Sequence, residues 1–418
     1  MIVIRNGNVL MADGWAQVDV LIRDGQIAAV GSGLEGDSQI DASGCLVGPG
    51  FVDLHTHLRE PGQTWKEDVA SGSRSAAAGG FTAVVAMPNT DPPIDSPKVV
   101  DLVAGLGAEA GLVEVIPSAA LTVGRAGHAV ADIDALYRAG VRVFSDDGDS
   151  VANAELLEEI MSIIAGLDGA VVAQHAEDAS LSRAGHMHEG EVSRRLGVGG
   201  LPAQAETEVV ERDLSLVRGT GARYHCQHVS SMMTVTVIRS AKEEGLPVTA
   251  EVTPHHLSFT DEDLASLDTN FKMYPPLRAE SDRQALVEAL RDGTIDVVAT
   301  DHAPHQQDEK GLAFTEAPRG VIGLETAAAV VWDTLRDRDA FFRVLSTAPA
   351  RIAGLSNQGR PVEVGSAANL VVFAPDETWK AAEFRSKSAN SPFLGREMRG
   401  RVRATIHQGK ITHESGVR

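Results

Sequence analysis

The sequence has little cysteine, because only Cys45 and Cys226 occur among its 418 residues. Two thiols are too few for a disulfide scaffold, and they predict a protein of a reducing compartment. No run reaches the roughly 18 apolar residues that a membrane-spanning helix needs. The N-terminal segment MIVIRNGNVL also lacks the basic region, the long apolar stretch and the cleavage site of a secretory signal. We therefore expect a cytoplasmic protein with no membrane partner.

The sequence also has fewer basic than acidic residues. The chain has 37 Lys and Arg residues against 58 Asp and Glu, and its formal net charge is −21. An acidic surface repels a phosphate backbone, so we expect no nucleic-acid partner. With 43% hydrophobic and 23% charged residues and no low-complexity tract, the composition is that of a folded globular protein. The length allows two or three domains of about 150 residues each and favours an enzyme.

The two ends of the chain have the pattern of β-structure. Apolar runs at 18–22 and 26–30 flank Arg23-Asp24-Gly25. Asp-Gly between two apolar runs predicts a tight hairpin, because glycine tolerates a positive φ. The C-terminal part is similar, with an apolar run at 368–373 and a final pair of strands around Gln408-Gly409-Lys410. We predict one small composite β-sandwich domain, built from residues 1–48 and 358–418.

The middle of the chain, residues 49–357, has a different rhythm. Short apolar runs alternate with longer stretches, two of which (154–164 and 282–290) have a helical pattern, and we expect long loops at 185–200 and 314–323. Near-continuous apolar strands separated by helices indicate a parallel sheet that is buried on both faces. Eight repeats of this unit predict a (β/α)8 TIM-type barrel, a fold of the α/β class. The eight runs are 51–54, 81–86, 112–116, 141–144, 170–173, 222–226, 247–252 and 295–299.

Polar side chains that can bind a metal ion or a substrate follow six of these eight predicted strands. In a barrel of this kind, functional residues collect where strands end and loops begin. The residues are His55 and His57 after the first strand, Asn89 after the second, Asp146 and Asp147 after the fourth, His175 after the fifth, His228 after the sixth and Asp301 after the eighth. This placement is the main functional observation in the sequence.

His55 and His57 are two residues apart, so both imidazoles point to the same side of an extended segment. Such a pair is a natural clamp for a divalent metal ion. A bare His-x-His is more often a hydrogen-bonded pair near a turn. Here Asp301 and two further histidines at equivalent strand ends favour the metal site. Arg59 has the same parity as His57, which places it toward the same cavity, with a surface salt bridge as the alternative.

The segment Asp146-Asp147-Gly148 has two interpretations. Asp and Gly are common turn residues, so a simple turn stays open. Its position after the fourth strand favours a role for one aspartate, whose two oxygens can bridge two cations. At the eighth strand, an aspartate such as Asp301 can both ligate a metal ion and relay a proton. His302 and His305, in the same segment, are candidates for substrate contact or for simple loop packing. Four further histidines are expected to be polar loop residues without an assigned role: His186, His188, His255 and His256.

Several longer segments, in order along nearly the whole chain, carry a resemblance to a known family. The first is GPGFVDLHTHLREPG at 48–62, and the others are MPNT at 87–90, FSDDG at 144–148, HVSS at 228–231, KMYPPLR at 272–278, TDHAPH at 300–305 and APRGVIGLET at 317–326. Together they resemble the amidohydrolase superfamily and, more narrowly, the bacterial dihydroorotases. His-x-His with a distant aspartate marks only the superfamily, whereas LREPG and MPNT are far more specific.

The resemblance implies a zinc site of two ions per chain, with a single ion as the alternative. His55, His57 and Asp301 would hold one ion, His175 and His228 would hold the other, and Asp147 would bridge them. Many relatives use a carboxylated lysine as the bridge, but the fourth strand here has Arg142 and no lysine nearby. This argues for the subtype with an aspartate bridge and against a hydantoinase or an allantoinase.

The resemblance also implies a catalytic role for Asp301 and a small-molecule substrate. Substrate contacts would come from His57, Arg59, Asn89, Tyr274, His305, Arg319 and Gly320. The planar fork of Arg59 suits a substrate carboxylate, because it can bind two oxygens at once. Two of these positions depart from the family pattern, since Tyr274 stands where Asn is usual and Arg319 where Phe is usual. Neither departure removes a metal ligand.

The implied activity is the reversible cyclisation of N-carbamoyl-L-aspartate to L-dihydroorotate in pyrimidine biosynthesis. One alternative is another cyclic-amide hydrolase, of the hydantoinase or allantoinase type. A second is a partner-dependent or scaffold dihydroorotase-like protein that supports aspartate carbamoyltransferase. Such scaffolds typically lose metal ligands, and this chain retains all six. We expect a homo-oligomer, with aspartate carbamoyltransferase as a further candidate partner.

Overall fold

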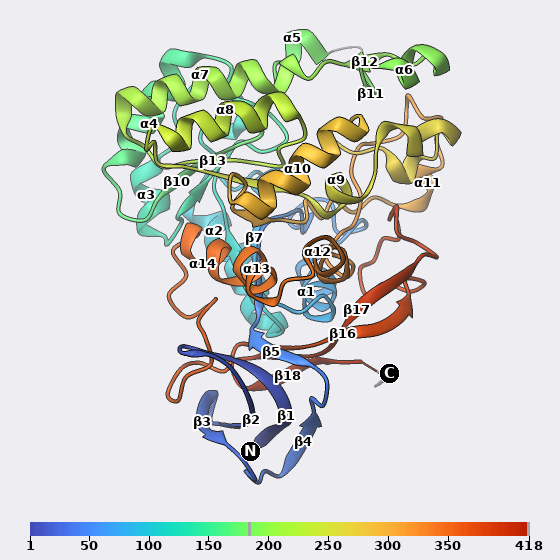
Figure 1. Ribbon diagram of the computed structural model, residues 1–418. Coiled ribbons are helices and arrows are strands. Elements are labelled where there is room, and N and C mark those ends of the chain that lie inside the picture. The colour runs from blue at the N-terminus through green and yellow to red at the C-terminus, as the bar shows by residue number, and fades with distance from the viewer. Residues whose placement is uncertain (183–184, 416–418) are drawn as a thin grey trace.

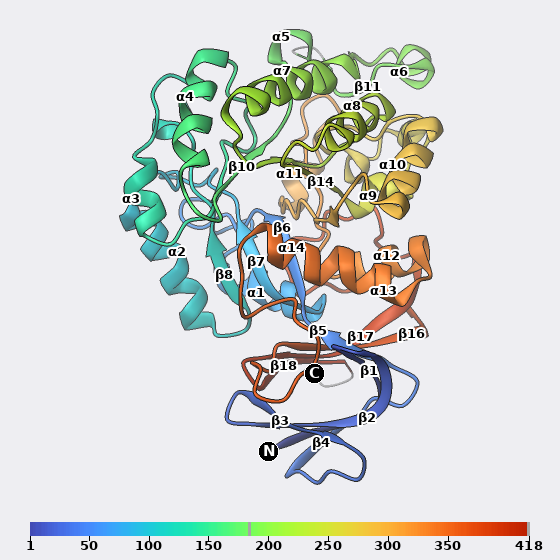
Figure 2. The same cartoon turned by 60° about the vertical axis from the view of Figure 1, so that its left-hand side comes forward.

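The two ends of the chain form one sheet. The computed structural model describes residues 1–182 and 185–415. Eight strands pair in the order β18-β17-β16-β5-β1-β2-β3, with β4 added on β1. They curl around a shared apolar core that includes Ile4, Val20, Val47, Val372 and Ile406, and they lie below the rest of the molecule, together with the N-terminus (Figures 1 and 2). The strands are β1 (Ile2–Met11), β2 (Gly14–Arg23), β3 (Gln26–Gly31), β4 (Ser38–Asp41), β5 (Leu46–Pro49), β16 (Leu370–Lys380), β17 (Glu397–His407) and β18 (Lys410–Glu414).

The predicted hairpins are confirmed. Arg23 pairs with Gln26, so Asp24-Gly25 is a two-residue turn, and both its residues have a positive φ, of 52° and 82°. Two successive positive φ values define the turn whose twist matches that of the strands. The same arrangement recurs at Gln408-Gly409, between β17 and β18.

All eight strands of the predicted barrel are present, each overlapping the expected run. Neighbouring strands pair in parallel within a three-stranded and a five-stranded sheet. Isolated bridges join these sheets at both junctions, Ala119 to Phe144 and Thr56 to His302, so the barrel closes. The strands are β6 (Phe51–Thr56), β7 (Phe81–Ala86), β8 (Glu114–Pro117), β9 (Val143–Phe144), β10 (Val171–Gln174), β13 (Tyr224–Cys226), β14 (Val248–Val252) and β15 (Val297–Val298).

Helices surround the strands (Figure 2). The helical patterns at 154–164 and 282–290 correspond to α4 (Ala154–Ala165) and α10 (Glu280–Asp292). In α4, the side chain of Asn153 caps the first turn, and the buried residues Leu157, Ile160, Met161 and Ile164 recur at helical spacing. The other main helices are α1 (Val69–Ala78), α2 (Pro97–Ala110), α3 (Ile133–Arg138), α7 (Gln204–Thr220), α8 (Met232–Glu243), α12 (Ala327–Leu335), α13 (Arg338–Phe342) and α14 (Ala348–Ile352).

A separate apolar cluster lies inside the barrel. It combines side chains of several strands, among them Val52, Leu54, Val85, Val171 and Val297, with residues of α14. Branched side chains of alternate strands fill the interior of such barrels, so the barrel is a packed support for its loops and not a pore. Within the described ranges, no helix is long and apolar enough to cross a membrane.

Two expectations about loops were wrong. The segment 185–200, expected as a loop, contains α6 (Glu191–Leu196) and the small parallel pair β11 (Met187–His188) and β12 (Gly200–Leu201). His255 and His256 are not loop residues but buried residues of α9 (Pro254–Ser258). Capping by the Thr253 side chain and a proline in the first turn start this short helix. The remaining short elements are α5 (Ala179–Ser182), α11 (Gln307–Lys310), η1 (Val123–Arg125), η2 (Asp261–Ser266), η3 (Thr269–Phe271) and η4 (Arg343–Thr347).

Candidate metal centre

The strand ends bring the six predicted metal ligands together at one face of the barrel. Two groups of potential ligands form there: one contains His55, His57 and Asp147, the other Asp147, His175 and His228, and within each group the ligand atoms lie within 4.8 Å of one another. Asp147 belongs to both groups. The sixth residue, Asp301, places its Oδ1 3.0 Å from His57 Nε2 and 3.6 Å from His55 Nε2.

Buried polar atoms at the centre of this cluster have no hydrogen-bond partner among the described residues. They are His55 Nε2 and Asp147 Oδ1, which face each other at 3.1 Å. Leaving buried polar atoms unsatisfied is costly, and a bound cation would satisfy both. Imidazole nitrogens and carboxylate oxygens are ligands that zinc accepts in proteins. The residues present therefore fit a site for divalent metal ions, although the geometry does not by itself select the metal or the number of ions.

A buried carboxylate that sequence reasoning missed supports the first histidine. Glu251, on β14, accepts a hydrogen bond from His55 Nδ1 at 2.6 Å, and its other oxygen lies 2.9 Å from His225 Nε2. This contact places the proton of His55 on Nδ1 and leaves Nε2 with its lone pair toward the cluster. Asn89 acts in the same way on His57, because its Oδ1 accepts from His57 Nδ1 at 2.9 Å. An acidic residue in the middle of the apolar run 247–252 was the sequence signal for Glu251.

Two carboxylates give the cluster negative charge. Burial would raise the pKa of the Asp147 carboxyl, but the neighbouring imidazoles of His55, His57 and His175 outweigh it and hold this pKa well below its usual range. Burial would also raise the pKa of Asp301, but the neighbouring histidines outweigh it and lower this pKa to about 2. Both carboxyl groups are therefore anions at neutral pH. Burial, together with His175 and His55, lowers the pKa of His228 to about 3, so its imidazole is neutral.

The backbone is strained at this site. Arg59, His228 and Asp301 all have a positive φ, of 60°, 32° and 46°. Side chains other than glycine rarely adopt this region, at a cost of about 1–3 kcal/mol each, and such residues cluster at functional sites. At these three strand ends, the chain turns sharply so that the side chains face the cavity.

The two neighbouring aspartates have different tasks. Asp146 turns away from the cluster, and its Oδ1 accepts hydrogen bonds from Leu121 N at 2.8 Å and Thr122 N at 3.2 Å. Asp147 faces the histidines. Asp146 therefore holds the loop that follows β8, whereas Asp147 lies in both groups of potential metal ligands.

The predicted substrate residues line a hollow of about 200 Å³ above the cluster. Arg59, in its wall, has its Nη2 3.3 Å from His305 Nε2. Burial lowers the pKa of Arg59 to about 10, so it remains a cation at neutral pH. Burial and the nearby cations lower the pKa of His305 to about 2, so its ring is neutral. The other predicted residues in the wall are His57, Asn89, Tyr274, Arg319 and Gly320.

Only a glycine fits at position 320. Its φ is 125°, and a Cβ atom there would lie 2.7 Å from the Cβ of Ala303 and 3.2 Å from Nε2 of His305. A larger residue would have to displace the loop that carries His305. The backbone thus approaches the cavity more closely here than any other residue type permits.

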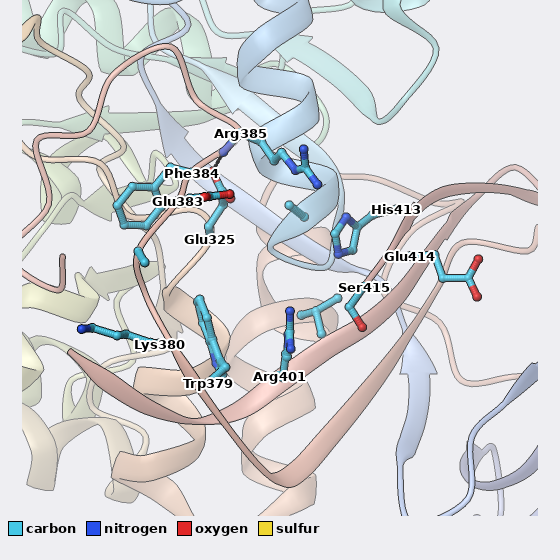
Figure 3. A pocket seen from close by; sticks show the side chains of 13 residues that line it. Glu325, Trp379, Lys380, Glu383, Phe384, Arg385, Arg401, His413, Glu414 and Ser415 are labelled. Atoms are coloured by element: carbon cyan, nitrogen blue, oxygen red, sulfur yellow. Dashed lines mark hydrogen bonds between the residues drawn. The ribbon is translucent and has the colours of Figure 1, made fainter. Parts of the chain in front are cut away.

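A second cavity, of about 320 Å³, lies where the barrel meets the β-sandwich. Trp379, Arg401 and His413 from the β-sandwich face Glu325 and Arg385 across it (Figure 3). It contains none of the six clustered residues. The candidate catalytic site is therefore the smaller hollow at the strand ends.

A closed (β/α)8 barrel, a β-sandwich made from both chain ends and a His/Asp cluster at the carboxyl ends of the strands together define a metal-dependent amidohydrolase. The dihydro-orotase-like family model matches residues 44–233. Over 413 residues the chain is 47% identical to the dihydroorotase of Mycobacterium tuberculosis, covering 96% of each chain. The chain belongs to the dihydroorotase family and is a cyclic amidohydrolase, as its sequence motifs predicted.

Further relatives agree in fold and family. The dihydroorotase of Caldanaerobacter subterraneus is 42% identical over 423 residues, which cover 99% of this chain and 97% of that one. Among solved structures, the L-hydantoinase (dihydropyrimidinase) from Arthrobacter aurescens matches with a TM-score of 0.87 and 26% identity, over 100% of this chain and 96% of that one. The predicted barrel and β-sandwich architecture is confirmed.

Proposed function

We propose that this enzyme interconverts L-dihydroorotate and N-carbamoyl-L-aspartate, in the pyrimidine-biosynthetic direction by cyclisation. The observation that supports this most directly is Asp147, whose carboxylate is shared between two groups of histidines beneath a cavity that contains a cationic arginine. The site thus offers places for two cations and for one carboxylate-bearing substrate. The dihydroorotase relatives supply the reaction.

The six clustered side chains would hold two zinc ions. His55, His57 and Asp301 would ligate the first, His175 and His228 the second, and Asp147 would bridge the two. When bound, such ions lower the pKa of water toward neutrality and polarise a carbonyl group. Glu251 and Asn89 fix the orientation of two of the imidazoles.

Asp301 is the proposed proton carrier. Its carboxylate is unprotonated at neutral pH and faces the cavity, so it can accept the proton of the attacking water. In the hydrolytic direction, it then delivers this proton to the ring nitrogen as the carbon–nitrogen bond breaks. In the opposite direction, it takes the proton from the attacking nitrogen of N-carbamoyl-L-aspartate and returns it to the departing carboxyl oxygen, which leaves as water after gaining a second proton from solvent.

Arg59 and His305 are the proposed substrate anchors. The guanidinium of Arg59 can bind both oxygens of the substrate carboxylate, and the neutral ring of His305 lies beside it. This cation favours dihydroorotate over hydantoin or allantoin, because neither of these rings bears a carboxylate. The hollow is small, and the side chains at its base, those of His57, His228 and Asp301, are buried.

We also propose that the enzyme acts in the cytoplasm as a homo-oligomer and associates with aspartate carbamoyltransferase, the enzyme whose product is the substrate of the cyclisation. The two buried free cysteines are consistent with a reducing compartment. Size-exclusion chromatography with light scattering, alone and with that enzyme, tests both associations. A monomeric mass in both samples would contradict them.

The function is tested by metal analysis together with turnover. We expect about two zinc ions per chain and turnover of dihydroorotate, but not of hydantoin or allantoin. Asp301→Asn should lower turnover by orders of magnitude while the melting temperature is retained. Turnover of hydantoin without turnover of dihydroorotate would contradict the proposed substrate, and near-normal turnover by the variant would contradict the proton-carrier role.

A further inference from the structure

The segment that connects β16 and β17, residues 381–396, leaves the β-sandwich and rises along the side of the barrel (Figure 1). We call it the strap. Near its start, Phe384 and Arg385 line the cavity at the junction with the barrel (Figure 3). Further on, it contacts the loops that follow β6 and β15, which carry Arg59 and His305. The strap therefore extends from the β-sandwich to the rim of the catalytic hollow.

The middle of the strap holds a buried carboxylate behind the catalytic residues. Ser386 Oγ donates to Glu67, and Lys387 N donates to Glu67 Oε1 at 3.2 Å. The other oxygen of Glu67 lies 3.4 Å from Nε2 of His302, the neighbour of Asp301 in the chain. The carboxylate of Glu67 therefore contacts both the strap and His302. Through this carboxylate, the strap supports the loop after β15 from behind.

Asn390 makes the most direct connection. Its Oδ1 accepts a hydrogen bond from His305 N at 3.1 Å, and its Nδ2 donates to Ala303 O and Gly320 O, both at 3.1 Å. Its backbone oxygen accepts from Ile322 N at 3.0 Å. Asn390 is only 4% exposed. One side chain therefore joins two stretches of the loop region, around 303–305 and 320–322.

These contacts require an amide side chain. They use one acceptor and two donors, which an Asn side chain supplies and an Asp side chain of almost the same shape does not. An aspartate here would face two carbonyl oxygens with no proton to donate. The two stretches that Asn390 joins also meet at the site itself, because His305 Nε2 donates to Arg319 O at 2.9 Å.

We propose that Asn390 is a positioning residue for the substrate-binding loops. Asn390 does not line the catalytic hollow. It acts through His305 and Gly320, because its hydrogen bonds fix the backbone of both residues opposite Arg59. This inference rests on the proposed function of those residues as substrate anchors. A displacement of about 1 Å in such anchors is enough to weaken a reaction by about a hundredfold.

The test compares two buried asparagines. Asn390→Asp removes the two donated hydrogen bonds near the site. Asn369→Asp is the matched control, because Asn369 is 6% exposed and joins two segments far from the hollow, donating to Asn357 O at 3.0 Å and accepting from Gln408 N at 2.8 Å. At about 1 kcal/mol per hydrogen bond, we expect Asn390→Asp to raise KM for dihydroorotate roughly tenfold or more. Asn369→Asp should lower the melting temperature comparably but leave KM unchanged, and both should retain the wild-type zinc content.

A second measurement does not depend on turnover. Hydrogen exchange of peptides that cover 303–323 should become faster in Asn390→Asp and not in Asn369→Asp, since the amides of His305 and Ile322 lose their support. Unchanged exchange, or an equal change of KM in the two variants, would overturn the positioning role. If the wild-type enzyme failed to turn over dihydroorotate, the proposed function would fall, and the exchange comparison would still decide whether Asn390 holds these loops.

Discussion

The guanidinium carbon of Arg319 lies 3.8 Å from the centre of the Tyr274 ring. The same ring lies 5.3 Å from the ring of His175, with 31° between their planes. Arg319 Nη2 also donates to Gly185 O at 2.8 Å. Guanidinium, phenol and imidazole thus form a stack that ties the loops after β10, β14 and β15 together over one side of the His/Asp cluster. The two departures from the usual family residues therefore form a single feature. The guanidinium of Arg319 packs on the aromatic face of Tyr274, and in doing so it covers that face from solvent.

Arg319→Phe and Tyr274→Asn should accordingly be non-additive. Each single substitution removes one half of the stack, and Tyr274→Asn also leaves a largely buried arginine without its aromatic partner. We expect each single variant to raise KM for dihydroorotate, and the double variant to be less impaired than the sum of the two predicts. A coupling of about 0.5–2 kcal/mol is expected for a partly desolvated cation–π pair. Strictly additive changes in kcat/KM would show that the stack has no role in binding.

The adjacent aspartates provide a matched pair of variants for the metal centre. Asp147→Asn removes the shared anionic ligand, so we expect the zinc content to fall and turnover to be lost. Asp146→Asn keeps an oxygen that can accept from Leu121 N and Thr122 N, so zinc content should stay at the wild-type level. Elemental analysis after dialysis against a weak chelator measures both. Equal metal retention by the two variants would contradict the bridging role of Asp147.

The fold could be predicted from the sequence because its signals are local. Eight apolar runs of strand length mark the barrel, and Asp24-Gly25 and Gln408-Gly409 mark hairpins whose residues need a positive φ. The six clustered His and Asp residues could be predicted for a related reason, since each follows shortly after one of those runs. The resemblance then selected Asp147 over Asp146, a choice that the spacing alone left open.

Support for the site could not be predicted, because it depends on contacts between distant segments. Asn390 lies 85 positions from His305 in the chain, and Glu251 lies 196 positions from His55. Neither contact leaves a periodic pattern. His255 and His256 were misplaced for a similar reason, because tertiary burial of a one-turn helix does not appear in a short polar stretch.

Glu251 is expected to control metal affinity without touching the ions. Its carboxylate accepts the Nδ1 proton of His55 and makes this imidazole a stronger ligand. Glu251→Gln keeps the size of the side chain but removes the charge. We expect zinc affinity to fall about 10–100-fold, measured by competition with a chelator of known affinity. Glu325→Gln, which alters a half-buried glutamate at the junction cavity, is the control and should bind zinc as the wild type does.

Glu325 should make stability depend on pH near neutrality. Burial raises the pKa of its carboxyl to about 7, against the hydrogen bonds from Ser75 Oγ and from the amides of Arg385 and Ser386, which lower it. The folded state therefore binds a proton more tightly than the unfolded state does. The stabilisation that this proton provides is complete below the unfolded pKa, near 4.5, and is lost as the pH rises through about 7.

Replacing the Glu325 carboxyl should make the stability of the protein less dependent on pH. In Glu325→Gln, the amide oxygen can still accept the same hydrogen bonds, but there is no charge to bury at high pH. We expect the variant to gain stability relative to wild type between pH 5 and pH 8, by roughly 2 kcal/mol, in urea unfolding at each pH. Glu383→Gln, an exposed position at the same cavity, should follow the wild-type profile. Parallel profiles for Glu325→Gln and wild type would mean that Glu325 reaches solvent well enough to ionise freely, and the raised pKa would be refuted.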